Sequence, residues 1–200
     1  MDKHEIYHLL NMLQNKDMDT GFHSLRVSKF ASELAMQLKM TDKEIEVVKI
    51  AGLLHDIGKI KISSKILLKP GSLSESEYEE IKRHPILGVE LLAPFQCSQD
   101  VLTIIREHHE RIDGSGYPDR LKGENISIGA KIIAVADSYD AMISDRKYKK
   151  RMDVDSAIKE IRRGSSTQFD ECVVNAFLMV VKEVFEEKSK QKSKNLLYQN

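Results

Sequence analysis

The chain has 200 residues, of which 41% are hydrophobic, so it is long enough to close a hydrophobic core and is not expected to be disordered. Its 31 basic and 31 acidic residues give a formal net charge of zero, which excludes a general attraction to polymeric nucleic acid or to a membrane. The two cysteines fit no C-x-x-C spacing, and the N-terminus lacks an apolar signal sequence. We therefore expect a cytoplasmic protein whose phosphate sites, if it has any, are local.

Apolar residues recur at helical spacing along nearly the whole chain. The first run already places Ile6, Leu9, Leu10 and Leu13 at i, i+3, i+4 and i+7, which is the pattern of an amphipathic helix. We expect helices over residues 6–13, 27–38, 42–57, 75–84, 85–92, 99–110, 128–143, 154–163 and 171–187. No stretch alternates in the manner of a strand, so the predicted fold class is all-α.

Helix boundaries follow from capping residues. Thr41 with Glu44 forms a capping-box sequence, and Gly58 is the expected stop of the helix that begins there. A long loop over residues 111–127 is rich in glycine, and ordered loops of this length are usually functional. We predict an N-terminal helix within residues 1–16, one domain over 17–187 and a frayed polar tail over 188–200.

The first two of the seven histidines belong to a motif that we expect to be a chance match without a metal-binding role. His4, Glu5 and His8 match H-E-x-x-H, in which one helix face presents two zinc-binding imidazoles and a glutamate base. A metalloprotease site needs this helix buried behind a substrate-binding sheet, and no strands are expected here. We therefore predict a solvated helix, and its packing on the domain or use as a dimer contact stays open.

A second group of metal-type side chains is spread over several predicted helices. Its members are His55, Asp56, His84, His108, His109 and Asp137. Each alone is more typical of a cap or of a hydrogen-bonded core residue, but imidazoles and carboxylates arriving from different helices are what a metal site in a bundle core requires. An aspartate can bridge two ions, and a two-metal site can activate water for displacement at a phosphate ester.

Basic residues accompany this group. Lys59 follows Asp56 by three residues, which places an ammonium near the same helix end. Arg146 and Lys149 follow the helix that contains Asp137. A basic run is usually a solvated face, but its position after a carboxylate helix favours phosphate contact.

Two signatures identify a resemblance. HDIGK at residues 55–59 is similar to the HD-x-x-G-K signature, and HHERIDGSGYP at residues 108–118 matches every fixed position of HHE-x-x-DG-x-GYP. The chain resembles the HD-GYP family of bacterial metal-dependent phosphohydrolases, which hydrolyse cyclic di-GMP, over roughly residues 17–185. The resemblance implies an HD-domain helical bundle with a metal centre in its core.

The resemblance also implies roles for individual residues. The metal ligands would be His23, His55, Asp56, His84, His108, His109 and Asp137, around two divalent metal ions, Fe or Mn, that Asp56 bridges. Phosphate-binding cations would be Lys59, Arg146 and Lys149, with Asp56 and Lys59 as catalytic residues. Gly116, Tyr117 and Pro118 would border the substrate cleft, although a merely tight and rigid loop is the alternative.

The chain departs from the family at one informative position. Members with a third metal have glutamate four residues before His23, where this chain has Asp19. Aspartate could ligate there together with Asp140, which lies three residues after Asp137, but Asp19 could equally favour the N-terminus of a helix. Two or three ions are therefore both open.

The expected function is phosphodiester hydrolysis of cyclic di-GMP to linear pGpG, with a second cut to GMP left open. One alternative is the same chemistry on another cyclic dinucleotide such as cyclic GMP-AMP. Another is a module that binds the cyclic dinucleotide or a partner without hydrolysing it. A diguanylate cyclase partner and a homodimer are also consistent with the sequence.

Overall fold

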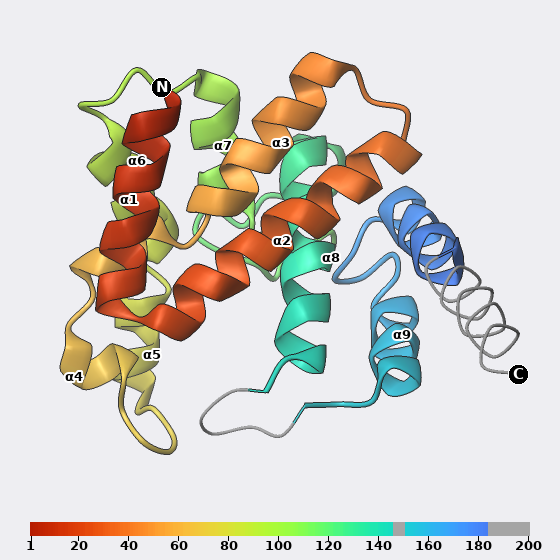
Figure 1. Cartoon of the computed structure of the whole chain (residues 1–200). Coiled ribbons are helices and arrows are strands. Elements are labelled where there is room, and N and C mark those ends of the chain that lie inside the picture. Colours follow the sequence, from red (N-terminus) through yellow and green to blue (C-terminus); the bar gives the residue numbers. More distant parts are fainter. Residues whose placement is uncertain (146–150, 184–200) are drawn as a thin grey trace, which may run out of the picture.

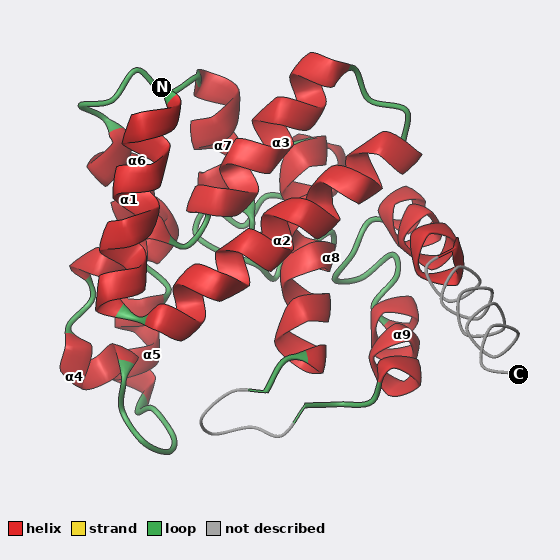
Figure 2. Cartoon of the chain, in the orientation of Figure 1, coloured by secondary structure: helices red, strands yellow, loops and turns green. Residues whose placement is uncertain are grey.

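The computed structural model describes residues 1–145 and 151–183, and almost all regular structure within them is helical (Figures 1 and 2). Within these residues the only β-type pairing is an isolated bridge between Ser165 and Phe169. The α-helices are α1 (Lys3–Lys16), α2 (Met18–Gln37), α3 (Asp42–Leu54), α4 (Ser64–Leu67), α5 (Glu75–Ile81), α6 (His84–Leu92), α7 (Gln99–Glu107), α8 (Ile128–Ile143) and α9 (Val154–Arg163). Two 3-10 turns, η1 (Ile57–Lys61) and η2 (Gly123–Asn125), and a helical segment over residues 171–183 complete the described chain. The predicted all-α class is confirmed.

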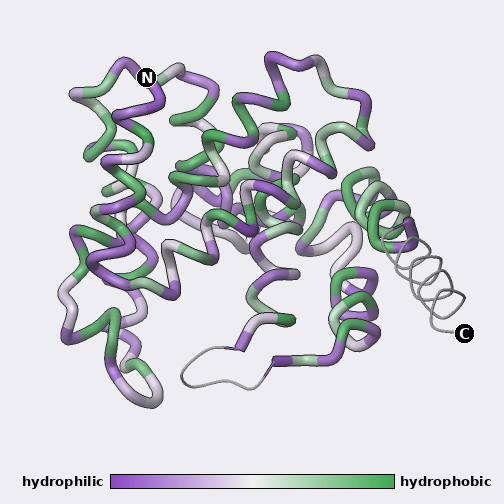
Figure 3. Tube along the Cα trace, viewed as in Figure 1, coloured by the Kyte–Doolittle hydropathy of each residue, from purple (hydrophilic) through white to green (hydrophobic). Residues whose placement is uncertain are grey.

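Helix α2 is the centre of the bundle, because it packs most extensively on α3 and α8 (Figure 1). The shared core includes the fully buried Leu34, Leu54 and Ile133. Hydrophobic and hydrophilic stretches alternate along the helices, as the amphipathic pattern predicts (Figure 3). None of the described helices combines the length and the hydropathy that crossing a bilayer requires.

Helix α1 joins the same core and does not stand apart from it. Leu9 and Leu13 are buried, and α1 packs on α2 and η1. His4 and His8 are exposed, and the Glu5 carboxylate accepts the Asp2 backbone N–H at 2.8 Å in a capping box. The H-E-x-x-H motif is therefore a solvated helix start, as predicted.

The end of α3 differs from the prediction. The helix ends at Leu54 and not at residue 57, because His55 turns its ring back and donates from Nδ1 to the Gly52 carbonyl at 2.8 Å. Gly58 therefore lies in η1 and does not stop the helix. A methyl group at Gly58 would collide with the backbone carbonyl oxygen of His84, so glycine permits the close packing of η1 on α6.

Helix α2 begins nine residues before the apolar pattern predicted. Its first turns bury the small or polar residues Thr20, Gly21, His23 and Ser24, which a search for apolar spacing does not detect. Helix α4 was also not predicted. The tail over residues 188–200 lies outside the described residues.

Candidate metal centre

The helix ends and helix faces bring seven side chains to one place in the bundle core. These are His23 from α2, His55 and Asp56 after α3, His84 at the start of α6, His108 and His109 after α7, and Asp137 from α8. They are the seven residues for which the sequence predicted a ligand role.

Within this cluster, three groups have potential ligand atoms that all lie within 4.8 Å of one another. The groups are His84, His108 and His109; His23, His55 and Asp137; and His55, Asp56 and His108. Because the third group shares a residue with each of the other two, the cluster is continuous.

Three of the imidazoles are oriented by the same contact. The Nδ1 atoms of His55, His84 and His108 donate to the carbonyl oxygens three residues earlier, at 2.8, 2.7 and 2.7 Å. A carbonyl only accepts, so each ring has its proton on Nδ1 and, when neutral, a lone pair on Nε2. All three Nε2 atoms are therefore available as metal ligands.

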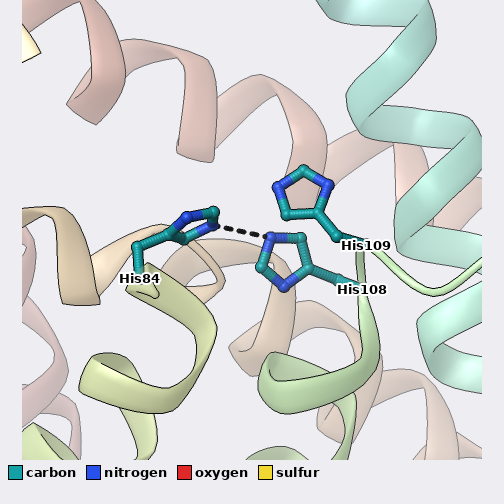
Figure 4. Close-up of side chains that lie close together, drawn as sticks. All are labelled: His84, His108 and His109. Atoms are coloured by element: carbon teal, nitrogen blue, oxygen red, sulfur yellow. Dashed lines mark hydrogen bonds between the residues drawn. The ribbon is translucent and has the colours of Figure 1, made fainter. Parts of the chain in front are cut away.

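These lone pairs fit a metal centre. The Nε2 atoms of His84 and His108 face each other at 3.2 Å (Figure 4), which brings two lone pairs together. The Nε2 atom of His55 is buried and has no hydrogen-bond partner. Buried polar atoms are rarely left without a partner, and divalent cations bound at the cluster would satisfy these three Nε2 atoms. The residues present therefore fit the metal ions that the sequence predicted.

Burial keeps most of the imidazoles neutral. It lowers the pKa of His84 to about 3 and that of His109 to about 4, and it lowers the pKa of His55 and His108 as well. A neutral imidazole is the form that binds metals, so these four side chains need not lose a proton first.

His23 differs from the other histidines. Burial alone would lower its pKa, but hydrogen bonds to Asp137 and Asp140 outweigh burial and raise the pKa to about 9. His23 Nε2 lies 2.9 Å from an Asp137 oxygen, and this contact lowers the pKa of Asp137 against the effect of burial. The two side chains form an ion pair.

Asp56 lies between the histidine groups. Its two carboxylate oxygens are each 3.4 Å from an imidazole Nε2, Oδ1 from His84 and Oδ2 from His55. Oδ2 also accepts from Lys59 Nζ at 2.7 Å, and Lys59 and the nearby histidines keep the pKa of Asp56 well below its usual range despite burial. This position is the one expected of a bridging carboxylate.

Two cavities open beside the cluster. One, of about 350 Å³, is lined by His23, Asp56 and Lys59 among other residues. The second, of about 580 Å³, is lined by His109 and Tyr117 among others. The cluster can therefore be reached by a ligand from two sides.

The glycine-rich loop contributes to the second cavity. Tyr117 stacks on the His109 ring, with centroids 4.7 Å apart and planes at 29°. Gly116 also lines this cavity, whereas Pro118 is not part of the lining. A side chain at Gly116 would meet the backbone of residues 109–111 at 2.5–2.6 Å. The loop is therefore tightly packed and also lines the cavity.

The remaining predicted residues are not part of the cluster. Asp19 is exposed in the first turn of α2, where negative charge is favourable, and it lines the first cavity. Asp140 is buried and its carboxylate contacts His23 and Arg26. Arg146 and Lys149 lie outside the described residues.

Two important residues were missed from the sequence. Arg26 contacts Asp140, and its position three residues after His23 was the available signal. Glu110 is part of the HHE-x-x-DG-x-GYP signature, but no role was predicted for it. Its buried carboxylate accepts the backbone N–H groups of Asp119 and Leu121 at 2.6 and 3.0 Å and so holds the loop closed.

Comparison with known proteins identifies the family. The family model described as "HD domain" matches residues 8–173. The chain belongs to the HD-domain family. The HD-GYP resemblance is supported by a Cyclic di-GMP phosphodiesterase of Thermotoga maritima, which is 40% identical over 185 residues, covering 90% of this chain and 50% of the relative.

Two other comparisons agree with this assignment. The 3'3'-cGAMP-specific phosphodiesterase 2 of Vibrio cholerae is 34% identical, over 88% of this HD-domain chain and 34% of the relative. The solved structure of Bd1817, an HDG"Y"P protein from Bdellovibrio bacteriovorus, superposes with a TM-score of 0.66 at 25% identity, covering 80% of this chain and 51% of that one. The chain spans between about a third and about half of the length of these relatives.

Proposed function

We propose that this HD domain hydrolyses a phosphodiester bond of cyclic di-GMP and releases linear pGpG first. The observation that carries the proposal is the continuous cluster of seven histidines and aspartates, with unprotonated Nε2 atoms 3.2 Å apart and a cavity on two sides. The name of the Thermotoga maritima relative supports cyclic di-GMP as the substrate. A second cut to GMP is a separate question for the same experiment.

Two divalent ions, iron or manganese, are part of the proposal. His23, His55 and Asp137 would hold one ion, and His84, His108 and His109 would hold the other, with Asp56 between them. Bound there, such ions would lower the pKa of a coordinated water molecule and neutralise charge on the phosphate.

The chain's own residues perform the remaining tasks. Lys59 Nζ, 2.7 Å from Asp56, borders the first cavity and offsets charge on a phosphate oxygen that approaches the centre. Arg146 and Lys149 are proposed to do the same for the second phosphate. Tyr117 and Gly116 border the second cavity, where a nucleoside can lie against the aromatic ring.

A second candidate substrate is a mixed cyclic dinucleotide. The Vibrio cholerae relative is named for 3'3'-cGAMP, and the choice of base depends on contacts within the cavity. The alternative from a different functional class is a receptor that binds a cyclic dinucleotide without hydrolysing it. It predicts tight binding without turnover.

Location, partners and boundaries complete the proposal. We place the protein in the cytoplasm, with cyclic di-GMP as its ligand, and a diguanylate cyclase or a second copy of the chain as its protein partner. The catalytic unit is assigned to residues 17–187.

The test is anaerobic incubation of the purified chain with cyclic di-GMP and added Mn(II) or Fe(II). Products are separated by chromatography, and metal ions per chain are counted in parallel. We expect pGpG from the unaltered chain, and a loss of turnover together with bound metal in Asp56→Ala. The variant with His4→Ala and His8→Ala is the matched histidine control and should retain both.

Three outcomes would contradict parts of the proposal. Unchanged hydrolysis in Asp56→Ala would overturn the site. Turnover of 3'3'-cGAMP but not of cyclic di-GMP would overturn the substrate. Tight binding of both dinucleotides with no product, despite two bound ions, would overturn hydrolysis in favour of a receptor.

A further inference from the structure

The Nδ1 atom of His23 is held by a different kind of contact from the Nδ1 atoms of His55, His84 and His108. His55, His84 and His108 sit at helix ends, where backbone carbonyls lack a helical partner and can accept from Nδ1. His23 lies in the interior of α2 (Met18–Gln37), whose carbonyls are already used within the helix. A side chain from another element fixes its Nδ1 instead.

Asp140 of α8 is that side chain. His23 Nδ1 donates to Asp140 Oδ2 at 2.7 Å, and the carboxylate is nearly buried, with 9% of the side chain exposed. The same ring presents Nε2 to Asp137 at 2.9 Å. His23 is thus held at both nitrogens by carboxylates one helical turn apart on α8.

Arg26 occupies the rest of the Asp140 carboxylate. Its Nε donates to Oδ1 at 2.6 Å and its Nη2 to Oδ2 at 2.9 Å. This two-point contact is the strong geometry of an arginine–carboxylate pair, and the guanidinium keeps its charge at all relevant pH values. Both oxygens of Asp140 are therefore engaged, and a fixed cation stands next to them.

We propose that Asp140, held by Arg26, is a positioning residue for His23 and not a ligand of a third metal ion. A third divalent ion at Asp140 would have to displace the Nδ1 contact and approach a guanidinium of like charge. Asp19, the other candidate for a third ion, is exposed and belongs to none of the ligand groups among the described residues. The centre of this chain then holds two ions. The inference rests on the proposed function only in taking the cluster as a metal centre.

The role predicts a specific effect on metal affinity. Side chains that orient a ligating imidazole typically contribute 10–100-fold to metal affinity. Replacing Asp140 should weaken the ion held by His23, His55 and Asp137 by about this factor. The ion held by His84, His108 and His109 should be unaffected, because the rings of His84 and His108 are oriented by backbone carbonyls.

The experiment is Mn(II) titration of the full chain without substrate. Free Mn(II) is measured by electron paramagnetic resonance, and bound metal at saturation by elemental analysis. The unaltered chain should bind two ions. Asp140→Asn and Arg26→Gln should still bind two at saturation, with one dissociation constant raised roughly 10–100-fold and the other changed by less than about threefold. Arg26→Lys should recover part of the loss.

A matched control is available on the surface. Arg106 contacts Asp119 with the same two-point geometry, at 2.6 and 2.7 Å, and neither residue belongs to a ligand group among the described residues. Arg106→Gln should leave both dissociation constants unchanged. Circular dichroism of each variant without metal shows whether its fold is retained. A variant whose affinity for both ions falls equally would show that Asp140 has only a structural role, which would overturn the proposal.

The outcomes separate this inference from the proposed function. Three ions in the unaltered chain, or a fall from three to two in Asp140→Asn, would overturn the positioning role. So would two ions with unchanged affinities in Asp140→Asn. A chain that binds two ions with the expected variant effects but hydrolyses no cyclic dinucleotide would refute the proposed function and leave the positioning role standing.

Discussion

At the scale of single residues, the candidate centre is built by fixing which ring nitrogen faces the core. Backbone carbonyls hold the Nδ1 atoms of His55, His84 and His108, and Asp140 holds that of His23. His109 is oriented differently, by its stack on Tyr117. Five separate local contacts therefore orient the five imidazole rings of the cluster.

The stack on His109 leads to a prediction. Tyr117→Ala should weaken Mn(II) binding by about fivefold, because an aromatic pair contributes roughly 0.5–1.5 kcal/mol beyond its buried area. Tyr117→Phe keeps the ring and should bind Mn(II) as the unaltered chain does. The titration is made without substrate, so contacts of the tyrosine with a nucleotide do not enter. Equal weakening in both variants would show that the hydroxyl, and not the stack, supports the site.

At the scale of elements, the close contact of η1 with α6 sets the distance between two parts of the centre. His55 and Asp56 directly precede η1, and His84 begins α6. Gly58 allows the η1 backbone to meet the His84 carbonyl, and Gly88 lies on the other side of the same contact. A glycine that looked like a helix stop therefore determines how near Asp56 comes to His84.

Substitution at this contact should destabilise the fold. Gly58→Ala places a methyl group against backbone atoms that cannot move aside, and we expect a loss of about 1–3 kcal/mol in the free energy of unfolding, the usual cost of overpacking. Gly88→Ala is the matched control, because its nearest neighbour is an Ile105 side-chain carbon at 3.3 Å that can shift slightly. Urea unfolding of the metal-free chains measures both. A milder effect at Gly58 than at Gly88 would contradict the packing role.

At the scale of the whole molecule, the cluster joins helices that are distant in the sequence. Its side chains come from α2, the end of α3, α6, the end of α7 and α8, so ions bound there would link most of the bundle. The cluster brings the lone pairs of His84 and His108 together and places the Asp56 carboxylate 3.4 Å from His84. Folding and metal binding are thus expected to be coupled.

This coupling can be measured by thermal unfolding. At a free Mn(II) concentration of about 100 times the dissociation constant, binding stabilises the native state by about 2.7 kcal/mol per site. For two sites in a chain of this length we expect a rise of roughly 10–20 °C in Tm relative to a sample in chelator. The variant with His4→Ala and His8→Ala should show the same rise. A rise that disappears in this control, or is absent from the unaltered chain, would contradict a metal site in the core.

The sequence by itself determined the helical class and the exposure of His4 and His8 on the first helix, and its family resemblance implied the seven side chains that cluster. Amphipathic spacing reports which face of a helix is buried, and the two signatures name four of the seven side chains, His55, Asp56, His108 and His109. Only the tertiary structure decided that α2 begins at Met18, that Gly58 is a packing contact and that Asp140 faces His23 and Arg26. These features depend on how helices approach one another, and the spacing of residues within one helix contains no information on the distance or angle to the next.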